Sequence, residues 1–232
     1  MSLQWKSRER WAVCLLLAAG FFVRIGWLIW RRSLEYAEGE AANIAINLAR
    51  HGVFGDPFAQ GTGATAHLTP SMSLVTAAAY AALGVRSTPA EAVLAFLSIL
   101  IVLGAGLIFY LAWRRAGLST VAGLVALAVF CLSPLNLKLE AVYFRAWEGG
   151  LAVLLLAICL YLTIAMSQLE RVRPSSFLVL ALAGALTFFV NPAAGLGAYA
   201  CIGWLALTRL PVRQWPVTIA IGLVALGIVL AP

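Results

Sequence analysis

The stretch RRSLEYAEGEAANIAINLARHGVFGDPFAQGTGATAHLTP, residues 31–70, is the polar exception in an otherwise apolar chain. It carries four of the nine acidic residues and both histidines of the 232-residue sequence. The runs that surround it are apolar over lengths that can cross a bilayer. Because side chains that transfer protons or bind metals are gathered in this one loop, we expect the functional site there.

The composition predicts an all-α membrane protein that crosses the bilayer several times. Hydrophobic residues make up 63% of the chain and charged residues 11%, whereas soluble domains average about 45–50% and about 25%. The net charge of +7 does not indicate nucleic-acid binding, because the arginines cluster at the ends of apolar runs and form no basic face with interleaved aromatics. The four cysteines lie far apart in apolar runs and favour small buried side chains over a disulfide framework or zinc site.

The apolar runs predict about seven membrane spans in one module that covers residues 1–232. The first run is too long for a signal peptide, and no small-residue cleavage site precedes its tryptophans. The last run ends without a polar tail, so we expect the sequence to be the front part of a longer chain. The expected spans are residues 11–30, 92–113, 117–135, 149–166, 177–190, 195–207 and 217–232.

Charges beside these spans predict a cytoplasmic N-terminus. In that orientation nine Lys and Arg residues lie inside and six outside, and every short inner connection carries at least two cations. Cationic inner loops are typical of membrane proteins. The orientation places residues 31–91 and 136–148 on the same outer side, where they can meet.

The outer loop, residues 31–91, is expected to hold two amphipathic helices at the membrane surface. Apolar residues recur at i, i+3, i+4 and i+7 from Ala41 to Leu48, and Gly52 stands where that helix would stop. A second short helix is predicted for residues 70–84, which begin with proline and end with glycine. The segment between them is rich in glycine and proline and can fold over a site.

Glu40 and Glu38 are the candidate catalytic acids. Both stand at the expected start of the first surface helix, where acids are also common for electrostatic reasons alone, because backbone N–H groups stabilise them. One of them could act as a general base on an acceptor hydroxyl or amine. Residues two apart on a helix point about 200° from each other, so we expect one to enter the site and favour Glu40.

Other polar residues on the outer side are candidates for binding a substrate. His67 is either an ordinary surface histidine or a contact to a phosphate or metal. Arg145 and Glu148 form either a simple ion pair or a pocket, in which Arg145 binds a lipid phosphate and Glu148 a metal or the acceptor. Lys138 could add charge for the same anion.

Two further residues leave alternatives open. Arg24 lies inside the first span, and it either extends outward to the interface or faces the bundle as a functional charge. Asn191, before Pro192, either breaks the helix or points into the outer cavity.

These residues resemble the GT-C type of polytopic membrane glycosyltransferase, in particular the protein-mannosyltransferase and aminoarabinose-transferase group. The resemblance is carried by RIGW (24–27), GEAANIAINLARHGVFGDPF (39–58), TGATAHLTP (62–70), RAWE (145–148) and NPA (191–193). In that family a seven-span module carries two surface helices and a catalytic acid in its first outer loop.

The resemblance implies that a sugar is transferred from a polyprenyl-phosphate donor to a lipid, glycan or protein acceptor. The reaction would take place at the outer, periplasmic face of a bacterial inner membrane, with Glu40, or Glu38 in its place, as the base. Some members use a divalent metal and others do not, so no cofactor is assigned.

Two other classes of function remain open from the sequence. A transporter component would be expected to show charges or broken helices near the bilayer midplane and inverted repeats; Arg24 is the candidate charge. A non-catalytic module that binds lipid or acts as a scaffold would have the same apolar spans.

Overall fold

The computed structural model describes residues 7–31, 39–58, 61–65, 69–133, 135–170, 172 and 174–230. Within these ranges the regular structure is helical, apart from one antiparallel bridge between Gly55 and Ala64. The expectation of an all-helical chain is therefore confirmed for the described residues.

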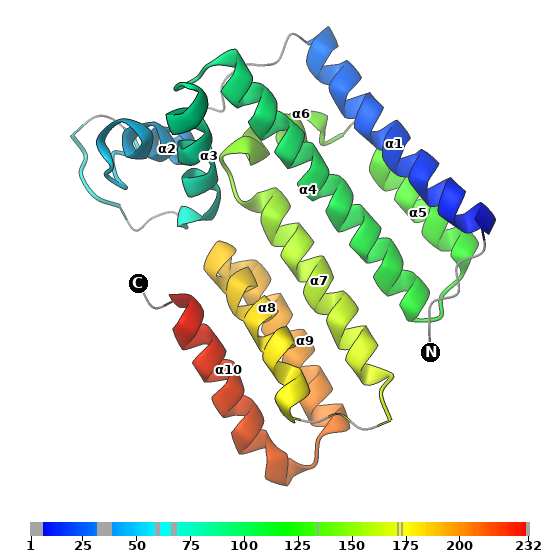
Figure 1. Cartoon of the computed structure of the whole chain (residues 1–232). Helices are drawn as coiled ribbons and strands as arrows, with labels where there is room; N and C mark the ends of the chain where they lie inside the picture. Colours follow the sequence, from blue (N-terminus) through cyan, green and yellow to red (C-terminus); the bar gives the residue numbers. More distant parts are fainter. Residues whose placement is uncertain are drawn as a thin grey trace.

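Each of the seven apolar runs contains a helix, with bounds a few residues from those expected (Figure 1). These helices are α1 (Ser7–Trp30), α4 (Thr88–Arg115), α5 (Thr120–Leu132), α7 (Gly149–Ser167), α8 (Phe177–Val190), α9 (Pro192–Arg209) and α10 (Trp215–Leu230).

The number of helices that can cross a membrane is smaller than the expected seven. Four segments of the described chain are long and apolar enough: α1, α4, α7 and Val212–Leu230, which includes α10. A fifth results if α5 and the bent segment after it count as one span. Helices α5 and α8 have 13 and 14 residues, about 20 Å of helix, whereas the hydrocarbon core is about 30 Å thick. Seven spans are thus not confirmed.

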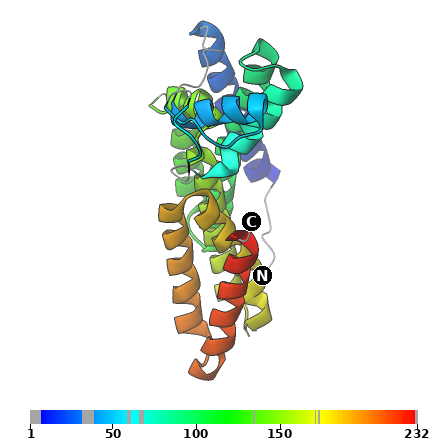
Figure 2. The same cartoon turned by 90° about the vertical axis from the view of Figure 1, so that its left-hand side faces the viewer.

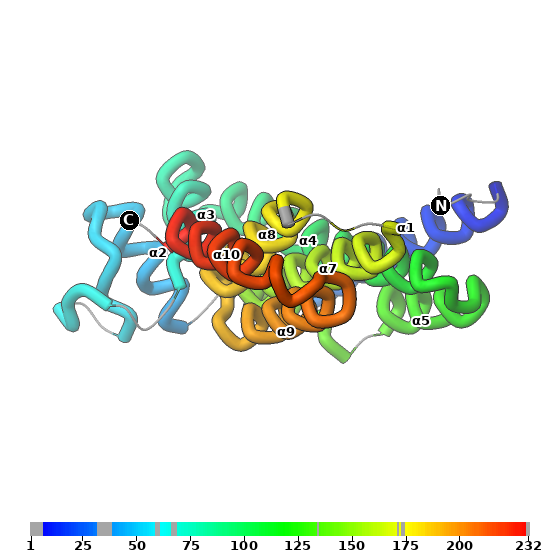
Figure 3. The backbone as a smooth tube through the Cα atoms, turned by 90° about the horizontal axis from the view of Figure 1, so that it is seen from below, coloured from blue at the N-terminus to red at the C-terminus, as the bar shows by residue number. Residues whose placement is uncertain are grey.

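The long helices form two groups that meet along α4 and α7 (Figures 1 and 3). In the first group, α1, α4 and α5 share a core that includes Val13, Ile99 and Leu127. In the second, α8 packs against α7, α9 and α10. Figure 2 shows the same array from its narrow edge, with α2 and α3 near one end.

Two short helices occupy the loop that the sequence singled out. Helix α2 (Glu40–His51) ends at Gly52, which has the left-handed φ of 71° that glycine adopts without strain. Helix α3 (Pro70–Leu83) ends before Gly84. The two helices pack on each other and on the start of α4 around Tyr80 and Leu94. They lie near the end of the array at which α1 ends and α4 begins (Figure 1).

A short helix that the sequence did not predict, α6 (Leu137–Ala141), follows α5 after a bend of 69°. Proline disfavours helical geometry in the residue before it. Ser133 is the C-cap of α5, and Pro134 follows it in the sequence. A single 3-10 turn, η1 (Tyr143–Arg145), continues toward α7. The bend turns the chain back over the α1–α4 pair, so that Glu140 lies beside α1.

Arg24 faces the interior of the bundle and is fully buried. Its Nη2 lies 2.6 Å from Glu140 Oε2, and its Nε donates to the same oxygen at 2.7 Å. Its Nη1 donates to the carbonyl of Cys131 at 2.8 Å, near the end of α5. Gly20 permits this approach, because a Cβ there would lie 2.9 Å from the Cβ of Cys131. The Arg24 side chain thus joins α1 to α6 through the ion pair and to α5 through the hydrogen bond.

We expect Glu140→Ala to lower the free energy of unfolding by about 3–5 kcal/mol, because it leaves the Arg24 guanidinium buried without a counter-charge. Denaturant titration in detergent micelles measures the change. The double variant R24L/E140L should lose markedly less, because it removes both charges. Glu170→Ala, at an exposed position, is the control. Equal losses in the single and double variants would contradict the prediction.

Candidate functional site

The two polar regions of the sequence meet at one end of the helix array. The start of α2 packs against the η1–α7 connection through Ala41, Ala42 and Ala146. From α3, Thr76 Oγ1 donates to the carbonyl of Arg145 at 2.6 Å. The described parts of residues 39–91 and 136–148 therefore form one polar end.

Glu40 is the first residue of α2 and is partly exposed. Gly39 precedes it with φ 112°, a conformation that other residues rarely adopt. The adjacent Ala41 and Ala42 lie against Ala146, so the first turn of α2, which is the positive end of its dipole, is held beside the start of α7. Glu38, the alternative acid, lies outside the described residues.

Arg145 is fully buried, and its guanidinium joins three elements. Its Nη1 lies 3.0 Å from Glu91 Oε2 on α4, and its Nε donates to the carbonyl of Ala141 at 2.7 Å. Glu91 Oε1 also accepts the hydroxyl of Tyr80, on α3, at 2.7 Å. The ion pair of Arg145 is thus made with Glu91, not with Glu148 three residues along.

The sequence reasoning missed Glu91 and Glu140 as the partners of the two buried arginines. Glu91 was placed at the end of the outer loop, because the span after it was expected to begin at residue 92. Helix α4 begins at Thr88, capped by Ser87, so Glu91 lies within its first turn. A glutamate at the polar edge of an apolar run was the available signal, but the sequence does not say which arginine it meets.

The other candidate residues are spread over the same end. Glu148 precedes α7 and is buried, with 8% of its surface exposed. Lys138 is exposed, and its Nζ lies 5.6 Å from the centre of the Tyr143 ring. Asn191 caps α9, because its Oδ1 accepts the N–H of Ala194 at 3.0 Å. His67 lies outside the described residues.

A polar cavity of about 220 Å³ lies along α2 and the loop that follows it. It is lined by Asn43, Ile46, Asn47, Arg50, His51, Asp56 and Phe58. Neither Arg145 nor Glu148 lines it. None of these residues is among the candidates that the sequence analysis singled out.

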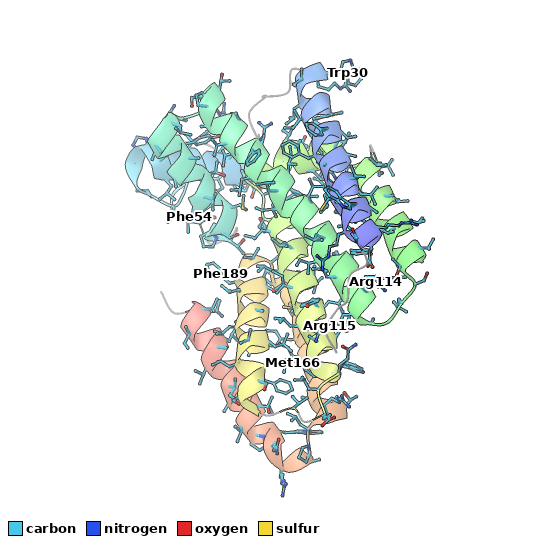
Figure 4. All side chains as sticks on the ribbon, turned by 45° about the vertical axis from the view of Figure 1, so that its right-hand side comes forward. Trp30, Phe54, Arg114, Arg115, Met166 and Phe189 are labelled. Carbon is cyan, nitrogen blue, oxygen red and sulfur yellow. The ribbon has the colours of Figure 1, made fainter. Side chains whose placement is uncertain are left out.

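A larger cavity of about 370 Å³ lies between α4, α5 and α7, away from the polar end. Its walls are apolar and include Gly106, Leu127 and Ile164. It reaches the last turn of α4, where Arg114 and Arg115 lie; Figure 4 labels both, with Trp30 at the far end of α1. This cavity offers no titratable group other than Tyr110 for chemistry.

Within the described ranges, no three His, Cys, Asp or Glu side chains are grouped so that they could hold a metal ion. No family model matches the chain, and the comparisons with curated proteins and with solved structures give no match either.

We expect Glu91→Gln to destabilise the polar end by about 3 kcal/mol, because the amide keeps an acceptor for Tyr80 but leaves Arg145 without its counter-charge. Unfolding in detergent gives the global change, and limited proteolysis of residues 39–83 gives the local one. Glu170→Gln makes the same substitution at an exposed site and should change neither. Unchanged unfolding in Glu91→Gln would mean that another group neutralises Arg145.

Proposed function

We propose that this protein is a membrane glycosyltransferase that moves a sugar from a polyprenyl-phosphate donor to an acceptor, with Glu40 as general base. The observation that supports it most directly is the position of Glu40. A partly exposed carboxylate begins α2, and its helical turn is held against Ala146 at the polar end of an apolar helix array.

The proposed reaction needs one base and one group that stabilises the leaving phosphate. Glu40 takes the proton of the acceptor hydroxyl as its oxygen attacks the anomeric carbon of the sugar. The bond between that carbon and the phosphate oxygen breaks, and the lipid phosphate leaves with the electron pair. Lys138 is an exposed cation at this end and is the candidate to stabilise it, together with His67.

In this proposal Arg24 and Arg145 have a supporting part. Both guanidinium groups are buried and paired with carboxylates. They hold α6 and η1 beside α1, α3 and α4, and thereby position the segment against which α2 begins. Glu148 and Asn191 remain proposed substrate contacts, although the Asn191 side chain also caps α9.

The membrane setting is part of the proposal. Large apolar side chains are exposed along α1 and α10, such as Phe22, Ile29, Leu223 and Ile228, and exposed apolar surface of this extent indicates a lipid environment. We further propose seven spans, amphipathic α2 and α3 at the outer surface, and a bacterial inner membrane with the N-terminus in the cytoplasm.

Two observations favour a transporter component as the second candidate. The bend between α5 and α6 and the intramembrane charge Arg24 are features of transport proteins. However, Arg24 and Glu140 neutralise each other, and the pair also binds the end of α5. The Glu40 experiment separates this candidate, and a non-catalytic lipid-binding or scaffold module, from the enzyme.

We expect Glu40→Gln to abolish sugar transfer, with a loss of at least about 100-fold in rate, because an amide cannot accept the proton. The measurement is transfer from a radiolabelled polyprenyl-phosphate sugar in proteoliposomes. Unfolding in detergent should stay within about 0.5 kcal/mol of the unchanged protein, because Glu40 is a partly exposed position.

Glu170→Gln is the matched control for this experiment, because it makes the same change at an exposed position on the connection between α7 and α8. It should transfer sugar at the normal rate. Full activity of the Glu40 variant would remove this residue from the role of base and would return the protein to the non-catalytic and transporter candidates.

The proposed orientation predicts which single cysteines a membrane-impermeant maleimide can reach. In a background without the four native cysteines, Val53→Cys, beside α2, should react in intact bacterial spheroplasts. Val212→Cys, between α9 and α10, should react only after lysis. Both positions are exposed, at 49% and 69%, so burial does not explain a difference. The reverse pattern would place the polar end in the cytoplasm.

A further inference from the structure

The polar cavity beside α2 is held open by hydrogen bonds between side chains and backbone. Asn43 Nδ2 donates to the carbonyl of Pro57 at 2.9 Å, and Asn47 Nδ2 donates to the carbonyl of Val53 at 3.1 Å. These bonds tie the loop after α2 to the face of that helix. The cavity therefore has a defined wall on each side.

An antiparallel bridge between Gly55 and Ala64 joins two described parts of this loop, a pair of segments that we call the hairpin. Asp56 donates its N–H to the carbonyl of Gly63 at 2.8 Å, and its Oδ1 accepts the N–H of Gly63 at 2.7 Å. Gly55 lies so close to the opposite segment that a Cβ would be 2.6 Å from the oxygen of Gly63. The hydrogen bond from Gly63 also holds the pKa of the Asp56 carboxyl below its usual value, so this wall carries a negative charge at neutral pH.

The side chains that line the cavity have the chemistry of a sugar-binding site. Amides at Asn43 and Asn47, a cation at Arg50 and a carboxylate at Asp56 offer both donors and acceptors. A sugar hydroxyl both donates and accepts, so it matches such a mixed lining better than a phosphate does, which only accepts. Phe58 adds an aromatic ring with 65% of its surface exposed, on which the C–H face of a sugar ring can stack.

The cavity lies on the same face of α2 as Glu40. Glu40, Asn43, Asn47 and Arg50 follow each other at intervals of three, four and three residues, which places them along one stripe of a helix. Glu40 and Arg50 are separated by about 15 Å along the axis. A short oligosaccharide bound along this stripe would therefore have one end beside Glu40.

We propose that this cavity binds the acceptor, and that the acceptor is a carbohydrate chain rather than a peptide or a lipid headgroup. The choice of a carbohydrate rests on the mixed donors and acceptors and on the exposed ring of Phe58. The assignment as an acceptor site rests on the proposed function, because it takes Glu40 as the base. The binding of a sugar to the cavity does not depend on it.

The test measures binding and transfer separately on the full chain in nanodiscs. Saturation-transfer NMR with maltotriose, mannotriose and chitotriose should detect at least one ligand. Phe58→Ala should raise the Kd of the trisaccharide that binds by at least about tenfold. Phe58→Trp should keep binding, because it keeps an aromatic face. Phe22→Ala removes an equally exposed ring, 69% exposed, from α1 and should bind normally.

The polar lining has its own pair of variants. Arg50→Ala should also raise the Kd of the trisaccharide that binds. Arg213→Ala, at an exposed position far along the chain, should not. Binding of none of the three trisaccharides, or normal binding by Phe58→Ala and Arg50→Ala, would overturn the inference.

Glu40→Gln separates the two proposals, because Glu40 does not line the cavity. Normal sugar binding with lost transfer supports both. Normal binding with normal transfer would overturn Glu40 as the base and leave the sugar site standing. Loss of transfer in Glu40→Gln without any sugar binding would keep the enzyme and overturn the carbohydrate acceptor.

Discussion

A buried arginine must be given a counter-charge, and this requirement shapes one end of the molecule. Arg24 on α1 is satisfied by Glu140 and by carbonyls near the end of α5. Helix α6 supplies the carboxylate that pairs with Arg24, so the 69° bend after α5 and the ion pair belong to one arrangement. Removing a charge from water costs several kcal/mol, and here close geometry and added hydrogen bonds offset that cost.

Arg145 meets the same requirement at a second point, and the two pairs together build the base of the polar end. Glu91 accepts from both Arg145 and Tyr80, so α3, α4 and η1 are joined by one carboxylate. Both arginines are buried and paired with carboxylates, whereas Asn43, Asn47 and Arg50 on α2 line a cavity. The buried charges and the cavity are therefore separate features of this end.

The sequence predicted the helices well, because apolar runs and glycine stops are local signals. The end of α2 at Gly52 and the start of α3 at Pro70 follow directly from the chain. The pairing of charges did not follow, because Arg24 and Glu140 are 116 residues apart and nothing local links them. The burial of Arg145 and its pair with Glu91 did not follow either, because both depend on tertiary packing. The polar cavity was missed because its lining includes a loop whose fold depends on contacts with α2.

The separation between Arg24 and Glu140 also has a consequence for how such a chain is made. A ribosome adds about 5–20 residues per second, so α1 is complete on the order of ten seconds before Glu140 exists. During that time Arg24 has no carboxylate from α6, and a free guanidinium is costly inside lipid. The ion pair between α1 and α6 can therefore form only after the chain has been made as far as Glu140.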